Sequence, residues 1–136
     1  MGIRVVWDND EKTIIRYIFE SEWAWEDIRT AANISNAMLD EIGRVTHFIY
    51  DTSQSKRVPD GALTHLRRYI GKEHPLTGHS VLVGAPKTSG VLLARGILSM
   101  MQRVYRAGWR FSFTESLEEA RALLAQHPVP EKIESP

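Results

Sequence analysis

Hydrophobic and polar residues alternate in two short segments near the start of the chain. Residues 3–7 and 13–19 are rich in β-branched and aromatic side chains, and the residues between them are polar. A β-strand places successive side chains on opposite faces, so this pattern is typical of two strands joined by a turn. We therefore expect an antiparallel hairpin.

The spacing of the apolar residues changes after residue 25. From there to residue 42 they recur at steps of three and four, which places them along one side of a helix. Glu26 and Asp27 lie in the first turn, where the helix dipole favours acidic side chains, and Gly43 is suited to end the helix. The pattern predicts a helix over residues 25–42.

Three further strand–helix pairs follow. We expect strands over residues 45–50, 80–84 and 109–114, and helices over residues 60–70 and 89–107 and from Ser116 onward. The first two strands are short and mostly apolar, as in strands covered on both faces, whereas the third alternates. Ser116 and Glu119 have the spacing of a capping box that opens the last helix.

The resulting order is ββαβαβαβα. Because crossovers that contain a helix join parallel strands, the order predicts an α/β fold with a five-stranded mixed sheet packed with four helices. The first strand is the antiparallel member. We expect a single domain over residues 1–126 and a flexible tail over residues 127–136, which is rich in proline and charge.

Composition narrows the classes of function. The chain of 136 residues has 17 basic and 17 acidic side chains and a formal net charge of +0, which argues against a general electrostatic contact with nucleic acid. It has no cysteine, so disulfides and thiol chemistry are excluded. The apolar segment around residues 91–105 is too short, and too interrupted by arginine, for membrane insertion. We expect a cytoplasmic protein.

The order of elements resembles that of the STAS domain, the fold of the anti-sigma-factor antagonists, over roughly residues 3–126. More narrowly, the residues Trp7-Asp8-Asn9, Trp23-Ala24-Trp25 and His74-Pro75 look like those of a group of uncharacterised bacterial STAS-like proteins. The resemblance implies a regulatory module that binds another protein.

In the antagonists, a serine in an Asp-Ser-Ser-Gly motif accepts phosphate from a partner kinase. When Gly61 is placed on the motif glycine, Pro59 and Asp60 occupy the two serine positions, so the phosphoacceptor is missing. Asp60 either imitates a permanently charged state or, as we favour, is an ordinary helix cap. Ser53 and Ser55 are alternative acceptors for phosphate, although serines are common in loops.

Ligands of open α/β sheets usually bind beyond the carboxyl ends of the parallel strands. This edge gathers Asp51, Thr52 and Ser53 after the third strand, and the segment with Lys87 and Ser89 after the fourth. With Asp60, these residues form the candidate edge for a partner or ligand. The segment over residues 84–90 has the composition of an anion site but lacks P-loop spacing, and an ordinary turn explains it better.

The other residue patterns in the sequence give little indication of metal binding or catalysis. The five histidines show no spacing of metal ligands: we expect His47 to be a hydrogen-bonded core residue, and His74 and His79 to lie at a turn. No serine–histidine–acid arrangement or nucleophile elbow is visible, so we expect neither catalysis nor a cofactor nor a metal. Trp23 and Trp25 are too close together to face inward on one helical turn, which leaves one of them for a partner surface.

Three functions follow in order of preference. The first is a non-catalytic STAS-like module for protein–protein interaction, with an unknown protein or a second copy of the chain as partner. The alternative is a small-molecule or lipid-binding domain with a cavity between sheet and helices, lined by apolar residues of the helix expected over residues 89–107. The third is an enzyme, whose reactive groups then lie among Asp51, Ser53, Lys87 and Ser89.

Overall fold

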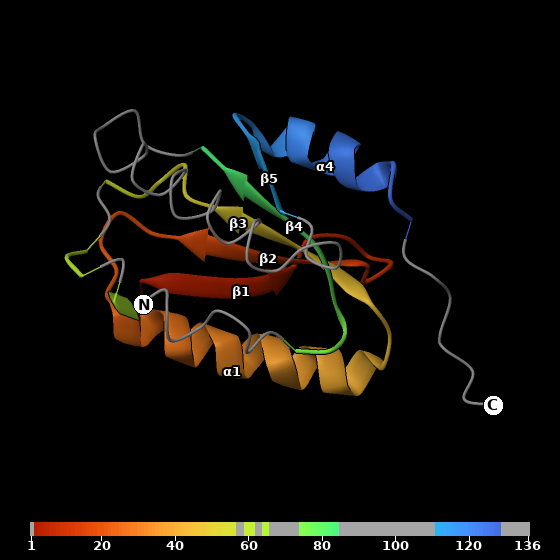
Figure 1. Cartoon of the computed structure of the whole chain (residues 1–136), viewed down its shortest axis with the longest axis horizontal. Coiled ribbons are helices and arrows are strands. Elements are labelled where there is room, and N and C mark those ends of the chain that lie inside the picture. Colours follow the sequence, from red (N-terminus) through yellow and green to blue (C-terminus); the bar gives the residue numbers. More distant parts are fainter. Residues whose placement is uncertain (1, 57–58, 62–63, 66–73, 85–110, 129–136) are drawn as a thin grey trace.

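The chain forms an α/β structure with one five-stranded sheet. The computed structural model describes residues 2–56, 59–61, 64–65, 74–84 and 111–128. Their elements are β1 (Ile3–Trp7), β2 (Ile14–Phe19), α1 (Trp25–Ile42), β3 (Thr46–Asp51), β4 (Thr77–Val83), β5 (Phe111–Thr114) and α4 (Leu117–Ala125) (Figure 1). The helix predicted over residues 89–107 lies outside the described residues, and the one over residues 60–70 is described only at residues 60, 61, 64 and 65.

The strands lie side by side in the order in which they occur along the chain. β1 pairs with β2 in the antiparallel sense, and every later pair is parallel. The mixed sheet with an antiparallel first strand is therefore confirmed. Within the described part of the chain, no helix is long and apolar enough to cross a membrane.

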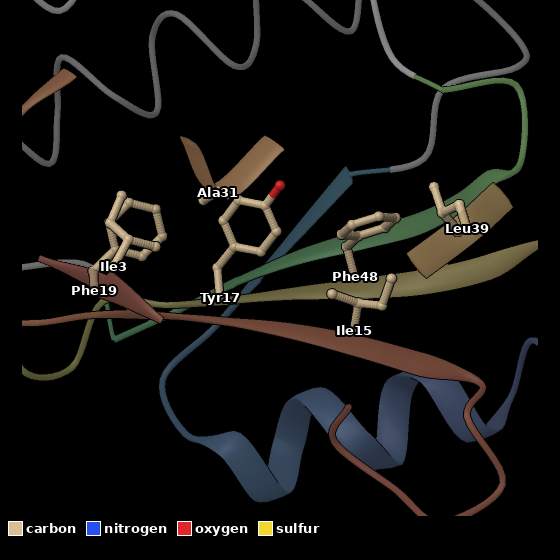
Figure 2. Close-up of a cluster of buried hydrophobic side chains, with 7 residues drawn as sticks. All are labelled: Ile3, Ile15, Tyr17, Phe19, Ala31, Leu39 and Phe48. Carbon is tan, nitrogen blue, oxygen red and sulfur yellow. The ribbon is translucent and has the colours of Figure 1, made fainter. Parts of the chain in front are cut away.

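Each face of the sheet carries its own apolar cluster. On the face under α1, side chains of β1, β2 and β3 pack against Ala31 and Leu39 of the helix (Figure 2). On the opposite face, Ile49, Val81 and Val83 pack against α4. Both helices cover the sheet because the strands alternate their buried residues between the two sides.

Helix α1 begins and ends as its sequence predicts. The carboxylate of Asp27 in the first turn accepts a hydrogen bond from the backbone N–H of Ala24, at 2.7 Å. Gly43 closes the helix with φ of 66°, and its N–H donates to the carbonyl of Leu39 at 2.9 Å. Glycine favours this left-handed conformation because it has no Cβ.

Strand β4 begins three residues earlier than the apolar pattern predicts, at Thr77 instead of Ser80. Thr46 faces Thr77 and Phe48 faces Ser80, so Gly78 and His79 together lie opposite a single residue of β3. This is a β-bulge, in which one strand carries an extra residue. The prediction that His79 lies at a turn is wrong: the residue is inside the strand and 8% exposed.

Candidate functional site

The predicted edge begins at Asp51, which is the last residue of β3. Its Oδ1 accepts hydrogen bonds from the backbone N–H of Ser53 at 3.1 Å and from the Ser53 hydroxyl at 2.6 Å. Thr52 bonds to the carbonyl of Val83 through its N–H, at 2.9 Å, and through its hydroxyl, at 2.7 Å. The side chains of Asp51 and Thr52 thus shape the loop after β3, and Ser53 is exposed.

The end of β4 packs directly on this loop. Gly84 has φ of 69°, and a Cβ at this position would lie 3.0 Å from the Cα of Ser53. A side chain there is strained by both the backbone and the contact. The described ends of β3 and β4 therefore meet as predicted, whereas Lys87 and Ser89 lie outside the described residues.

Two tryptophans hold the far part of the same loop. The indole Nε1 of Trp23 donates to the hydroxyl oxygen of Ser55 at 2.9 Å, and that of Trp25 donates to the carbonyl of Asp60 at 2.7 Å. The indole of Trp25 also stacks on the imidazole of His65, with ring centroids 4.9 Å apart and planes at 8°. Residues between β2 and the start of α1 thereby fix a loop that lies 30 or more residues further along the chain.

The inference that one of these tryptophans is exposed is wrong. Trp25 is 8% exposed and Trp23 is half-buried, and their rings meet edge to face at 5.1 Å. Trp23 precedes α1 and Trp25 begins it, so the two side chains do not share a helical turn. Among the described residues of this loop, the exposed side chains are instead polar: Ser53, Gln54, Lys56 and Asp60.

Asp60, which the resemblance to the anti-sigma-factor antagonists predicts to replace a phosphoacceptor serine, is exposed. Gly61 follows it with φ of 84°, and the N–H of His65 donates to the carbonyl of Gly61 at 3.0 Å, which forms one helical turn. The two interpretations of Asp60, as a helix cap and as an imitation of a permanently charged residue, both remain predictions.

A second polar group, which the sequence did not reveal, lies at the opposite end of the sheet. The side chain of Asp8 is 2% exposed and binds Arg121 of α4 through both oxygens, at 2.9 and 2.8 Å. Arg16 of β2 approaches the same carboxylate at 3.3 Å. The hydrogen bond to Asp8 raises the pKa of Arg121 above its ordinary value, so this guanidinium stays charged.

Beside this group the surface is hollowed by about 550 Å³. The lining residues come from the β1–β2 turn, the starts of β2 and β3 and the C-terminal half of α4: Asp8, Asn9, Thr13, Ile14, His47, Arg121, Leu124, Ala125, His127 and Pro128. Because Asp8 and Arg121 are 113 residues apart, no local motif indicates this region.

Three histidines meet next to the hollow. His47 is 7% exposed and hydrogen-bonded, as predicted for a core residue. The ring centroid of His79 lies 6.4 Å from that of His47 and 4.7 Å from that of His127. No group of three potential ligands among the described residues has the geometry of a metal site. Elsewhere, His74 bonds to Asp40 at 2.7 Å, which the sequence did not suggest.

The carboxyl-end loop, which the structure describes at residues 51–56, 59 and 60, exposes polar side chains and is fixed by hydrogen bonds at both of its ends. The hydroxyl of Ser53 donates its hydrogen bond to the carboxylate of Asp51. Within the described part of the chain, no histidine hydrogen-bonds to either residue. No family model matches the chain, and no curated protein matches it at a significant level.

Proposed function

We propose that the chain is a STAS-like, non-catalytic module that binds a protein partner through the carboxyl-end loop, at residues 51–56, 59 and 60. The observation that carries this proposal is the pair of indole hydrogen bonds, from Trp23 to Ser55 and from Trp25 to the carbonyl of Asp60. They hold the backbone of a loop in which the exposed side chains among the described residues are polar.

The physical argument concerns the cost of ordering a loop. Binding residues often lie on loops that a rigid scaffold positions. A loop that is already held in one conformation loses less entropy when a partner binds, so more of the contact energy appears as affinity. Asp51, Thr52 and Gly84 fix one end of the loop and the two tryptophans fix the other.

The resemblance to STAS domains supports the same surface, because the family uses the corresponding loop and helix start toward its partners. The proposal differs from the family pattern in one respect: Pro59 and Asp60 replace the serines, so association here does not depend on phosphate at that position. Ser53 is the exposed hydroxyl of this loop, whereas the hydroxyl oxygen of Ser55 accepts a bond from Trp23.

The small-molecule or lipid-binding alternative gains no specific support. The residues expected to line its cavity, over residues 92–101, lie outside the described residues. The hollow that is described lies at the other end of the sheet. A native mass spectrum of the purified protein distinguishes the two functions, because a retained small molecule adds mass that denaturation removes.

The direct test is a comparison of matched surface variants in a pull-down from extract of the cells that make the protein. Ser53→Arg and Asp60→Arg change exposed side chains of the loop, and Asn36→Arg makes the same change on the exposed side of α1. We expect the wild type and N36R to recover the same partner, and each loop variant to recover at least about tenfold less, as for loss of a central contact.

Trp25→Phe tests the ordering argument itself. The variant keeps an aromatic ring against His65 but loses the donor to Asp60. We expect weaker partner binding with unchanged helix content by circular dichroism. Equal recovery by the loop variants and N36R, or no specific partner at all, contradicts the proposal.

A further inference from the structure

The hollow between the β1–β2 turn and the end of α4 has mostly apolar walls. Ile14 and Leu124, which are 8% and 2% exposed, belong to its lining together with Ala125 and Pro128. Its volume of about 550 Å³ falls within the range of about 300–1,000 Å³ that is usual for small-ligand sites. The hollow therefore has the size for a small molecule, and its polar groups indicate which kind.

The hydrogen-bond acceptors of the lining are occupied by other groups of the protein. Both oxygens of the Asp8 carboxylate accept hydrogen bonds from Arg121. The amide oxygen of Asn9 accepts the backbone N–H of Thr13 at 3.0 Å, and the carbonyl of His127 bonds to a neighbouring imidazole. A ligand that mainly donates hydrogen bonds therefore meets acceptors that already have partners.

Two hydrogen-bond donors of the lining, in contrast, remain available. The amide oxygen of Asn9 accepts from Thr13, so its Nδ2 is the group that donates to the Thr13 hydroxyl oxygen, at 2.6 Å. The hydrogen of that hydroxyl has no acceptor among the described residues. Arg121 binds Asp8 through Nε and Nη2, and within the same described part of the chain its Nη1 has no hydrogen-bond acceptor. The lining thus offers a hydroxyl and part of a guanidinium to a group that accepts.

The exposed charge of the described lining is positive. The side chain of Arg121 is 45% exposed, whereas that of Asp8 is 2% exposed and lies behind it. Glu118 and Asp51 also attract Arg121, but neither is among the residues that line the hollow. A guanidinium with free N–H groups binds carboxylates well, because its planar donors match the carboxylate oxygens.

We propose that the hollow binds a small organic acid, whose carboxylate accepts hydrogen bonds from Arg121 and Thr13 and whose apolar part contacts Leu124 and Pro128. Both parts of the ligand are needed, because an ion pair with an exposed arginine alone contributes little. The site does not depend on the proposed partner surface, which lies at the other end of the sheet. It is also separate from the cavity expected among residues 92–101.

Titration of the full chain with three probes, followed by NMR at individual amides, tests the proposal. Benzoate carries a carboxylate and an apolar ring, benzyl alcohol keeps the ring without the charge, and acetate keeps the charge without the ring. We expect benzoate to shift the amides of Thr13, Ala125 and His127 saturably, with a dissociation constant of about 1 mM. Benzyl alcohol and acetate should each bind at least about tenfold more weakly.

Two matched pairs of variants locate the binding. Ala125 is exposed and lines the hollow, so Ala125→Trp fills it and should abolish the saturable shifts. Ala37→Trp makes the same change on the exposed side of α1 and should not affect binding. Thr13→Val removes the hydroxyl and should weaken benzoate binding about tenfold, whereas Thr30→Val on the exposed side of α1 should leave it unchanged.

The ion pair of Asp8 and Arg121 stays intact in all four variants, and unchanged amide spectra of β3 verify that each variant is folded. Saturable binding of benzoate that A125W abolishes and T13V weakens supports the site. Three results overturn it: no saturable shift with benzoate, equal affinity for benzyl alcohol, or undiminished binding in A125W or T13V.

Discussion

At the scale of single residues, Gly78 shows how one missing side chain permits a polar contact in the sheet. A Cβ at this position would lie 2.6 Å from Nδ1 of His47 and 3.1 Å from Cγ1 of Val45. We expect Gly78→Ala to lower the free energy of unfolding by about 1–3 kcal/mol, as overpacking does, when measured by urea denaturation. The control is Ala37→Gly on the exposed side of α1, which changes the same methyl group without a packed neighbour and should cost about 1 kcal/mol or less. An unchanged stability of G78A would mean that the imidazole has room to move.

The hydroxyl of Tyr17 provides a second test at this scale. It lies 2.6 Å from the hydroxyl of Ser35, and burial raises the pKa of Tyr17 to about 12. Because the folded-state pKa lies above the unfolded value of 10.0, its contribution to stability is fully present below about pH 10 and is lost as the pH rises toward 12. We expect the free energy of unfolding to fall over this interval by up to about 2 kcal/mol more in the wild type than in Tyr17→Phe. Parallel curves for the two proteins would contradict this prediction.

At the scale of elements, Asp8 fastens α4 to the hairpin. Its carboxylate is 2% exposed and bonds to Arg121 and Arg16, so its removal leaves two arginines without their partner. We expect Asp8→Ala to cost about 2–4 kcal/mol, and Arg121→Ala less because that side chain is 45% exposed. Urea denaturation of the single and double variants should give a coupling energy of about 1–3 kcal/mol. The control is Arg29→Ala on the exposed side of α1, which should leave the free energy of unfolding nearly unchanged. Additive effects of Asp8→Ala and Arg121→Ala would exclude the coupling.

The elements also show what a sequence can and cannot predict. The hairpin, α1, β3 and α4 follow from apolar spacing and local caps, such as Ser116, whose hydroxyl oxygen accepts the N–H of Glu119 at 3.1 Å. The start of β4 does not, because Thr77, Gly78 and His79 resemble a turn and enter the strand only through the bulge opposite His47. Burial of those residues depends on β3, not on their own neighbours in the chain.

The two ends of the sheet also differ in how much of each the sequence predicts. The carboxyl-end loop was predictable because parallel strands bring Asp51 and Gly84 to one edge whatever their side chains. The tryptophan bonds to Ser55 and Asp60 were not predictable, since they depend on how α1 packs across the sheet. The pair of Asp8 and Arg121 joins residues that lie 113 positions apart in the sequence, so no local motif predicts it.

At the scale of the whole molecule, the end of α4 decides how firmly the last element is attached. The carbonyl of His127 bonds to His47, and Pro128 lines the hollow with it, so these two residues belong physically to the packed structure. We expect a chain that ends at Gln126 to be about 1–2 kcal/mol less stable than one that ends at Pro128, because a buried imidazole donor loses its acceptor. Thermal unfolding of the two truncated chains at neutral pH measures this difference. Equal stability of the two chains would show that the bond from His47 to the carbonyl of His127 contributes nothing.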